Sequence, residues 1–393
     1  MRTRHLLGIT FLLCVAPTGV WSASTTAVQT ELKPMLKITW QVGTEPPEGL
    51  QCPAGGFLGT TLVYTCGAGQ RSSFMNKSWA LDLSNEKAGY VPLPDYPGAK
   101  LQELFGMPVG NALYCWGGFN FTDPYGYKDG YRLSRHEGKW TWENLPPLPY
   151  PLSNAGICAI GTTIYVCGGA DFDSKKLSYT AADRDGKNPR IGAHLLMLDT
   201  KHLEAGWKRL PDCPGTPRFM FAMEAVGGRI YVIGGAKGHG SEPMYRKHLS
   251  IVDNWAYDPK RSEWTQLRDL PISSGNFYDS GSLVYQNRYI MLVGGYQYDK
   301  IANPDGTVRD KYGKASKHYP EKEYYSDVFV YDTRMGLFGT ADPLPLNNNA
   351  PLTLVRDDNI YLIGGEIGEA TIEGKAYLHY PALLLEGKIE EIR

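Results

Sequence analysis

Residues that can bind a polar ligand gather in the segments that follow a repeated glycine mark and in the returns between repeats. Tyrosine rings pack on apolar ring faces, carboxylates and amides hydrogen-bond hydroxyls, and arginine or lysine holds a carboxylate. The candidates are Lys100, Asn154, Arg218, Glu242, Arg246, Tyr278, Lys317, His318 and Glu366. Taken singly, each is more simply a solvated loop residue. Together, their types predict a site for a small, polyhydroxylated and anionic ligand.

The element that must position these residues is an apolar run ending in a glycine mark, which occurs six times. The marks begin at Gly67, Gly117, Gly168, Gly234, Gly294 and Gly364. Each run is β-branched and aromatic, as strands are. A second run often ends in aspartate, a third leads from an aromatic residue into prolines, and a fourth is rich in small residues. The fourth repeat shows this with "RIYVIGG", "NWAYD" and "WTQLRDLP". The pattern predicts four strands in every copy.

Four strands with a glycine pair after the second and an aromatic residue on the fourth resemble the Kelch repeat. Six copies imply an all-β fold, a six-bladed Kelch-type β-propeller. The last copy lacks a tryptophan strand, while residues 36–49, "LKITWQVGTEPPEG", have a fourth-strand pattern with no blade before them. We therefore expect the N-terminal strand to complete the last blade and close the ring.

The same architecture predicts where a site lies. In an antiparallel meander the loops after strands two and four share one face. The long segments all follow strand two, at 119–130, 170–192, 236–253, 296–326 and 366–375. We expect a site on this face, around the axis.

The remaining sequence bounds the domain organisation. Residues 1–22 have a basic start, an apolar core and small residues near the end, which predicts a signal peptide and export to the periplasm or medium. Residues 23–35 are assigned to a linker and 36–393 to the propeller. A net charge of −1 does not suggest nucleic-acid binding, and the mature chain has no apolar run of membrane-spanning length. Its six cysteines are expected to be small core residues, with no zinc spacing.

A narrower resemblance lies in the last two blades. The fifth loop contains Lys314, His318 and Glu321, is followed by "YYSDV", and precedes a blade that opens "IGGE". This is similar to the exported N-acetylneuraminate epimerases, or sialic acid mutarotases. The resemblance implies equilibration of sugar anomers by general acid–base opening and closing of a hemiketal. It implies no metal and no cofactor.

The resemblance also implies a catalytic glutamate after the first glycine of the fourth repeat, where this sequence has Gly235. Two interpretations stay open. In the first, the protein is an isomerase with its carboxylates relocated to Glu242 and Glu366. The substrate is then held by the cationic candidates Lys100, Arg218, Arg246, Lys317 and His318. Alternatively, a non-catalytic propeller binds a carbohydrate or a protein. A copper oxidase is disfavoured, because His239, His248 and His318 show no suitable arrangement.

Overall fold

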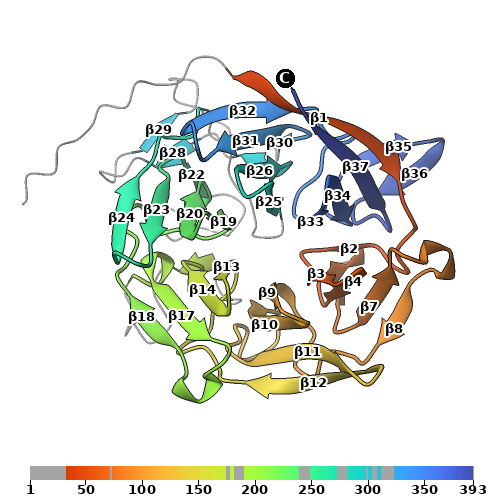
Figure 1. The fold of residues 1–393 in the computed structure, drawn as a ribbon, viewed down its shortest axis with the longest axis horizontal. Helices are drawn as coiled ribbons and strands as arrows, with labels where there is room; N and C mark the ends of the chain where they lie inside the picture. The colour runs from red at the N-terminus through yellow and green to blue at the C-terminus, as the bar shows by residue number, and fades with distance from the viewer. Residues whose placement is uncertain are drawn as a thin grey trace, which may run out of the picture.

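The computed structural model describes residues 32–70, 73–173, 178–180, 190–238, 248–271, 281–297, 300–302, 308–310 and 323–392. Six blades of four antiparallel strands radiate from one axis (Figure 1). The predicted all-β, six-bladed propeller is confirmed. Short 3₁₀ turns are present at η2 (Glu86–Ala88), η3 (Ile191–Ala193) and η4 (Leu203–Ala205). Among the described residues no helix has the length and apolar character to cross a membrane.

Each blade runs from an inner strand at the axis to an outer strand at the rim. Blades 1 to 3 comprise β3 (Ala54–Leu58), β4 (Thr61–Thr65), β7 (Ser78–Asp82) and β8 (Val91–Leu93); β9 (Gln102–Val109), β10 (Ala112–Phe119), β11 (Gly130–His136) and β12 (Lys139–Leu145); and β13 (Gly156–Ile160), β14 (Thr163–Cys167), β17 (Leu195–Asp199) and β18 (Lys208–Leu210). Blades 4 to 6 comprise β19 (Ala222–Val226), β20 (Arg229–Ile233), β23 (Trp255–Asp258) and β24 (Glu263–Gln266); β25 (Ser282–Tyr285), β26 (Tyr289–Val293), β31 (Val328–Asp332) and β32 (Leu337–Ala341); and β33 (Leu352–Arg356), β34 (Asn359–Ile363), β37 (Leu384–Glu391) and β1 (Lys33–Val42).

The N-terminal strand closes the ring, as the sequence predicts. β1 pairs antiparallel with β37 from Leu36↔Glu391 to Val42↔Leu385, and parallel with β32 of blade 5 (Figure 1). It begins at Lys33, inside the segment assigned to a linker. Leu36 and Ile38 are 0% and 4% exposed in the core shared by blades 5 and 6. Closure therefore joins the two ends of the chain in one eight-stranded sheet.

The glycine pairs bring neighbouring blades together. At Gly168 φ is +61°, and a Cβ there would lie 2.7 Å from the carbonyl oxygen of Arg218 in the next blade. The following amide, of Gly169, donates to that same carbonyl at 2.9 Å. The pairs at Gly118, Gly295 and Gly365 repeat this bond with Leu152, Asn348 and Leu50. Only glycine combines a left-handed backbone with this close approach.

Tryptophans of the outer strands form a second tie between blades. The indole nitrogens of Trp142, Trp264 and Trp40 donate to the proline carbonyls of Pro94, Pro211 and Pro343 in the preceding blade, at 2.8 to 2.9 Å. Trp40 lies on β1, so the N-terminal strand makes the same contact as the other outer strands. This confirms its role as the fourth strand of the last blade.

The six cysteines of the described residues are all buried, and none is in a disulfide. Burial raises the pKa of the Cys66 thiol to about 12. Burial also raises the pKa of the thiols of Cys115, Cys158 and Cys167. Thiols held neutral in this way are unreactive. The expectation that the cysteines are small core residues is met.

The loops after strand two, together with β2 (Leu50–Gln51) from the segment after β1, form their own layer on one face. This layer contains β2 (Leu50–Gln51), β5 (Ala68–Gly69), β6 (Ser73–Phe74), β15 (Asp171–Asp173), β16 (Ser178–Thr180), β21 (Ala236–Gly238), β22 (His248–Ile251), β27 (Tyr296–Gln297), β28 (Lys300–Ala302), β29 (Val308–Asp310), β30 (Glu323–Tyr324), β35 (Glu369–Ile372) and β36 (Lys375–Leu378). β22 from blade 4 pairs with β28 from blade 5. The loops of these two blades therefore share one small sheet.

Candidate functional site

The candidate site lies at the axis on the loop face, where the inner strands begin. In five blades the chain enters its inner strand through a non-glycine residue with positive φ. We call these residues the axial ring: Cys52, Glu103, Asn154, Met220 and Ala350, with φ of 51°, 58°, 53°, 54° and 54°. The equivalent of blade 5 lies outside the described residues. Recurrence in five blades shows that the conformation belongs to the architecture, at a cost of roughly 1–2 kcal/mol per residue.

Contacts between blades hold the axial ring together. The Cys52 amide donates to the Ala350 carbonyl and the Met220 amide to the Asn154 carbonyl, both at 3.0 Å. Three ring members pack in one apolar cluster with residues that follow or face the glycine pairs; the cluster contains Cys52, Phe119, Ala170, Phe219, Met220, Ala236 and Ala350. Side chains from five blades therefore converge at the axis. The ring is a buried floor for the loop layer.

Glu103 supplies a carboxylate to this floor. Its side chain is only 7% exposed. The thiol of Cys52, in the adjacent blade, donates to Glu103 Oε1 at 3.4 Å. Glu103 is not among the residues predicted from the sequence. The available signal was its repeat position: Glu103 precedes Gly117 by the same interval as Asn154 precedes Gly168.

Glu366, predicted from the sequence, belongs to the same layer. It is half-buried and forms a backbone bridge with Asn349, the neighbour of Ala350 in the ring. Equivalent bridges place Ala170 and Ala236 in the axial cluster. From Glu366 the contacts run through Asn349 and Ala350 to Cys52 and so to Glu103. The fold thus joins Glu366, through its backbone, and Glu103, through its side chain, in one continuous arc of contacts around the axis.

Buried amides complete the polar groups of the site. Asn154 is 4% exposed, and its Oδ1 has no hydrogen-bond partner among the described residues. Asn349 is 1% exposed, and neither its Oδ1 nor its Nδ2 is partnered there. Leaving a buried polar group unpaired costs about 1–3 kcal/mol. A polar ligand at the axis would supply the missing bonds.

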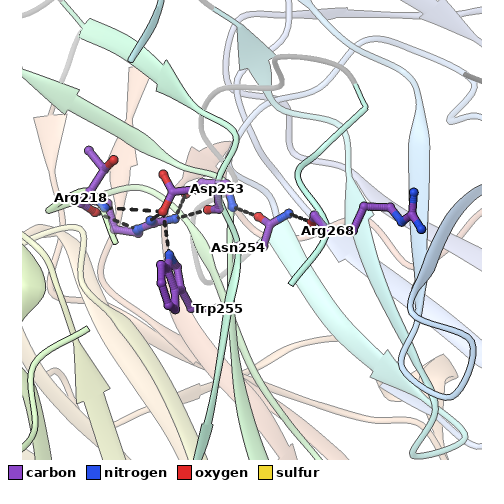
Figure 2. Close-up of polar contacts among 7 residues, drawn as sticks. Arg218, Asp253, Asn254, Trp255 and Arg268 are labelled. Carbon is purple, nitrogen blue, oxygen red and sulfur yellow. Dashed lines mark hydrogen bonds and ion pairs between the residues drawn. The ribbon is translucent and has the colours of Figure 1, made fainter. Parts of the chain in front are cut away.

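Arg218 is buried and makes several contacts within the protein. Its side chain is 1% exposed, and Nη2 contacts Asp253 Oδ2 at 2.5 Å (Figure 2). Nη1 donates to the carbonyls of Gly234 and Asp253 at 2.9 and 2.8 Å, and Nε to that of Thr216 at 3.0 Å. The guanidinium therefore holds the backbone carbonyl of Gly234, the first residue of the fourth glycine pair, in place. Direct contact between Arg218 and a substrate stays a prediction.

Asp253 is held ionised by the same network. Burial raises the pKa of its carboxyl, but Arg218 and hydrogen bonds from Trp255 and Thr216 outweigh burial and hold it below its ordinary value. Asn254 continues the network, since its Oδ1 accepts from the Gly234 amide and its Nδ2 donates to the Arg268 carbonyl (Figure 2). Both backbone groups of Gly234 are thus fixed by side chains.

Gly235 has no space for the carboxylate that the resemblance implies. Its φ is +100°, and a Cβ there would lie 2.6 Å from Phe221 Cβ and 3.0 Å from the Phe219 carbonyl. Real Cβ atoms do not approach so closely, and Phe221 Cβ cannot move without the backbone. The glycine is therefore required by packing in this chain.

The other predicted residues fall in two groups. Lys100 is exposed on the loop face, and its carbonyl accepts from Asn120 Nδ2 at 3.0 Å. Five predicted residues lie outside the described part of the chain: Glu242, Arg246, Tyr278, Lys317 and His318. Within the described part, no three His, Cys, Asp or Glu side chains converge as a metal site would require.

A cavity of about 170 Å³ follows the axis between the inner strands of all six blades. Its lining includes Ala54, Gly106, Ile157, Glu224, Ser282 and Leu352. The Ser282 hydroxyl donates to Glu224 Oε1 at 2.7 Å. The axis is therefore open enough for small molecules such as water between the inner strands.

Comparison with known proteins agrees with this architecture. Residues 106–365 match the family model described as the KLHDC2/KLHL20/DRC7 Kelch-repeats domain. The chain therefore belongs to the Kelch-repeat family, as its glycine pairs and outer-strand tryptophans indicate.

The individual relatives are more specific. The chain is similar to the N-acetylneuraminate epimerase of Haemophilus influenzae (strain 86-028NP), with 24% identity over 87% of this chain and 91% of the relative. The enzyme of the same name from Pasteurella multocida (strain Pm70) is 22% identical over 83% and 89%. A solved structure titled "Structure of YjhT" superposes with a TM-score of 0.62 at 16% identity, covering 90% of this chain and 100% of that one. It shows the shared propeller fold.

Proposed function

We propose that this protein binds an anionic sugar of the sialic-acid type at the axial ring and interconverts its anomers. The observation that carries the proposal is the arc joining Glu103 and Glu366, in a chain similar over most of its length to proteins named N-acetylneuraminate epimerase. Anomer interconversion needs two proton-transferring groups near one ring. Two carboxylates around one axis are suited to this task.

The proposed reaction requires no net change of atoms. One carboxylate takes the proton of the anomeric hydroxyl while the bond between the anomeric carbon and the ring oxygen breaks. The other carboxyl donates its proton to the ring oxygen. After rotation the steps run in reverse and restore both protonation states. General acid–base catalysis of this kind contributes about 10²–10⁴ in rate.

The proposal assigns the remaining groups to binding. The unpartnered amides of Asn154 and Asn349 hold sugar hydroxyls. The exposed cation Lys100 attracts the substrate carboxylate. Arg246, Lys317 and His318 stay predictions for the same role. Glu103 takes the place of the carboxylate that Gly235 excludes, and Glu242 stays an alternative base.

The test follows anomer exchange by NMR after one anomer of N-acetylneuraminate is dissolved. The wild-type protein is expected to accelerate exchange, and Glu103→Gln and Glu366→Gln each to reduce the rate by about 10². Glu369→Gln is the matched control, because Glu369 is an exposed glutamate of the same loop as Glu366. A wild-type protein no faster than buffer would refute the enzyme, and two fully active variants would refute the carboxylate assignment.

A second candidate is a propeller that binds the sugar without catalysis. The absence of a carboxylate at Gly235 favours it. It predicts that the wild-type protein binds N-acetylneuraminate in calorimetry but does not change the rate of anomer exchange. The two measurements together separate the candidates.

A further inference from the structure

Three phenylalanines form one aromatic cluster on the loop face. The ring centroids of Phe74 and Phe121 lie 5.2 Å apart, those of Phe119 and Phe121 5.9 Å, and those of Phe74 and Phe119 6.3 Å, all edge to face. Phe119 is fully buried, Phe74 is half-buried and Phe121 is 47% exposed. The cluster therefore extends from the core, at Phe119, to the surface, at Phe121.

The cluster adjoins the axial ring. Phe74 ends β6 in the loop layer of blade 1, while Phe119 ends β10 of blade 2 and Phe121 follows it. Phe119 packs in the same apolar cluster as Cys52, whose thiol contacts Glu103. An aromatic surface thus lies next to the end of the carboxylate arc.

The backbone at Phe121 is fixed in a way that presents its ring. Asn120 is 7% exposed, and its Oδ1 accepts from the Thr122 amide at 2.9 Å. Its Nδ2 donates to the Lys100 carbonyl at 3.0 Å, and its own amide donates to the Tyr125 carbonyl at 3.0 Å. Burying a phenylalanine ring is worth about 1.5–3 kcal/mol, yet these contacts hold Phe121 half-exposed. Such preorganisation favours a ligand that covers the ring.

We infer that Phe74 and Phe121, backed by Phe119, form a stacking subsite for the apolar face of a sugar ring. This inference rests on the proposed function and specifies the ligand that the site prefers. The ligand is a pyranose that places one C–H face or an N-acyl methyl group against the aromatic rings. Its hydroxyls point toward Asn154 and the carboxylates. Aromatic packing adds affinity without requiring charge. The subsite therefore selects the shape of the sugar, while Glu103 and Glu366 transfer the protons.

The experiment compares wild-type protein with Phe121→Ala, Phe121→Tyr and Met335→Ala. Met335 is the matched control, because it is 53% exposed and lies in the β31–β32 turn on the opposite face. N-acetylneuraminate is the probe, with calorimetry for binding and NMR for exchange. Phe121→Ala is expected to weaken binding roughly 3- to 10-fold and to raise KM with kcat unchanged. Phe121→Tyr keeps an aromatic ring and should bind as wild type does. Met335→Ala should also match wild type.

The outcomes separate the two proposals. If the wild-type protein binds and exchanges the sugar and Phe121→Ala is indistinguishable from it, the subsite is refuted and the proposed function stands. If kcat falls and KM stays constant, the ring positions catalytic groups and the stacking inference is likewise refuted. If the wild-type protein neither binds nor exchanges the sugar, both proposals fall. Equal thermal midpoints of all variants would show that the fold is intact.

Discussion

Gly235 shows at the residue scale how a backbone conformation limits chemistry. Its dihedral and its contact with Phe221 come from the blade packing that every repeat shares. A carboxylate cannot be carried at this position unless Phe221 moves. Glu103 and Glu366 are instead acidic residues on the loop face whose repeat positions accept side chains.

Substituting this glycine tests the packing argument. Gly235→Ala is expected to cost about 3 kcal/mol or more in the free energy of unfolding, because strain and a steric clash add. Gly227→Ala is the control, since Gly227 has a φ of +59° in the same blade with no atom near its Cβ position. It should lose only about 1 kcal/mol. Equal losses in urea denaturation would contradict the role given to Phe221.

The buried pair of Arg218 and Asp253 predicts a pH dependence. Because the folded-state pKa of Asp253 is below its ordinary value of about 3.9, the pair stabilises the fold above about pH 4. That contribution is lost as pH falls through the folded-state pKa. Asp253→Asn should lose about 3–5 kcal/mol at pH 7 and lose less stability than wild type on acidification.

Unfolding free energies measured in urea between pH 7 and pH 2 check this prediction. Asp258→Asn is the control, since Asp258 lies at the end of β23, the strand that follows Asp253, and instead accepts from the Lys260 amide at 2.9 Å in a hairpin turn. Parallel pH curves for wild type and Asp253→Asn would show that the pair does not contribute.

At the scale of elements, short sequence motifs have local physical causes. Each aspartate that ends a third strand accepts a hydrogen bond from the backbone amide two residues later, at 2.9 to 3.0 Å. The pairs are Asp82 with Ser84, Asp199 with Lys201, Asp258 with Lys260 and Asp332 with Arg334. These are turns closed by a side chain. Strand number and order were therefore predictable, because each signal lies within one repeat.

The loop layer was predictable only in part. The face on which the loop layer lies follows from the alternation of loops in a meander, and the sequence predicts it. The pairing of β22 with β28 was not, because it joins two insertions of different blades with no shared pattern. The burial of Arg218 was not predictable either, because nothing in its local sequence shows that it pairs with Asp253.

At the scale of the whole molecule, stability depends on closing the ring. β1 covers the edges of both β37 and β32 and buries Leu36 and Ile38. An open propeller would expose these edges to other chains. Burial of each of the two side chains contributes about 1.5–3 kcal/mol.

Two truncated chains test closure. A chain starting at Lys33 keeps β1 and is expected to match the full chain in thermal midpoint. A chain starting at Gly43 lacks β1 and should unfold at a lower temperature and form aggregates, measured by calorimetry and size-exclusion chromatography. A monomeric Gly43 chain with an unchanged midpoint would contradict the closure argument.

The sequence by itself determined the repeat, the number of blades, the closing strand and the face that carries the long loops. Those features depend on patterns that recur at equivalent positions, and propeller packing is a contact between one repeat and the next. Only the tertiary structure decided which polar side chains meet. Glu103, Cys52 and Glu366 come from three different repeats, and Arg218 pairs with Asp253, which lies 35 residues further along the same repeat. The contacts of the first three residues depend on how neighbouring repeats pack, which no single repeat encodes.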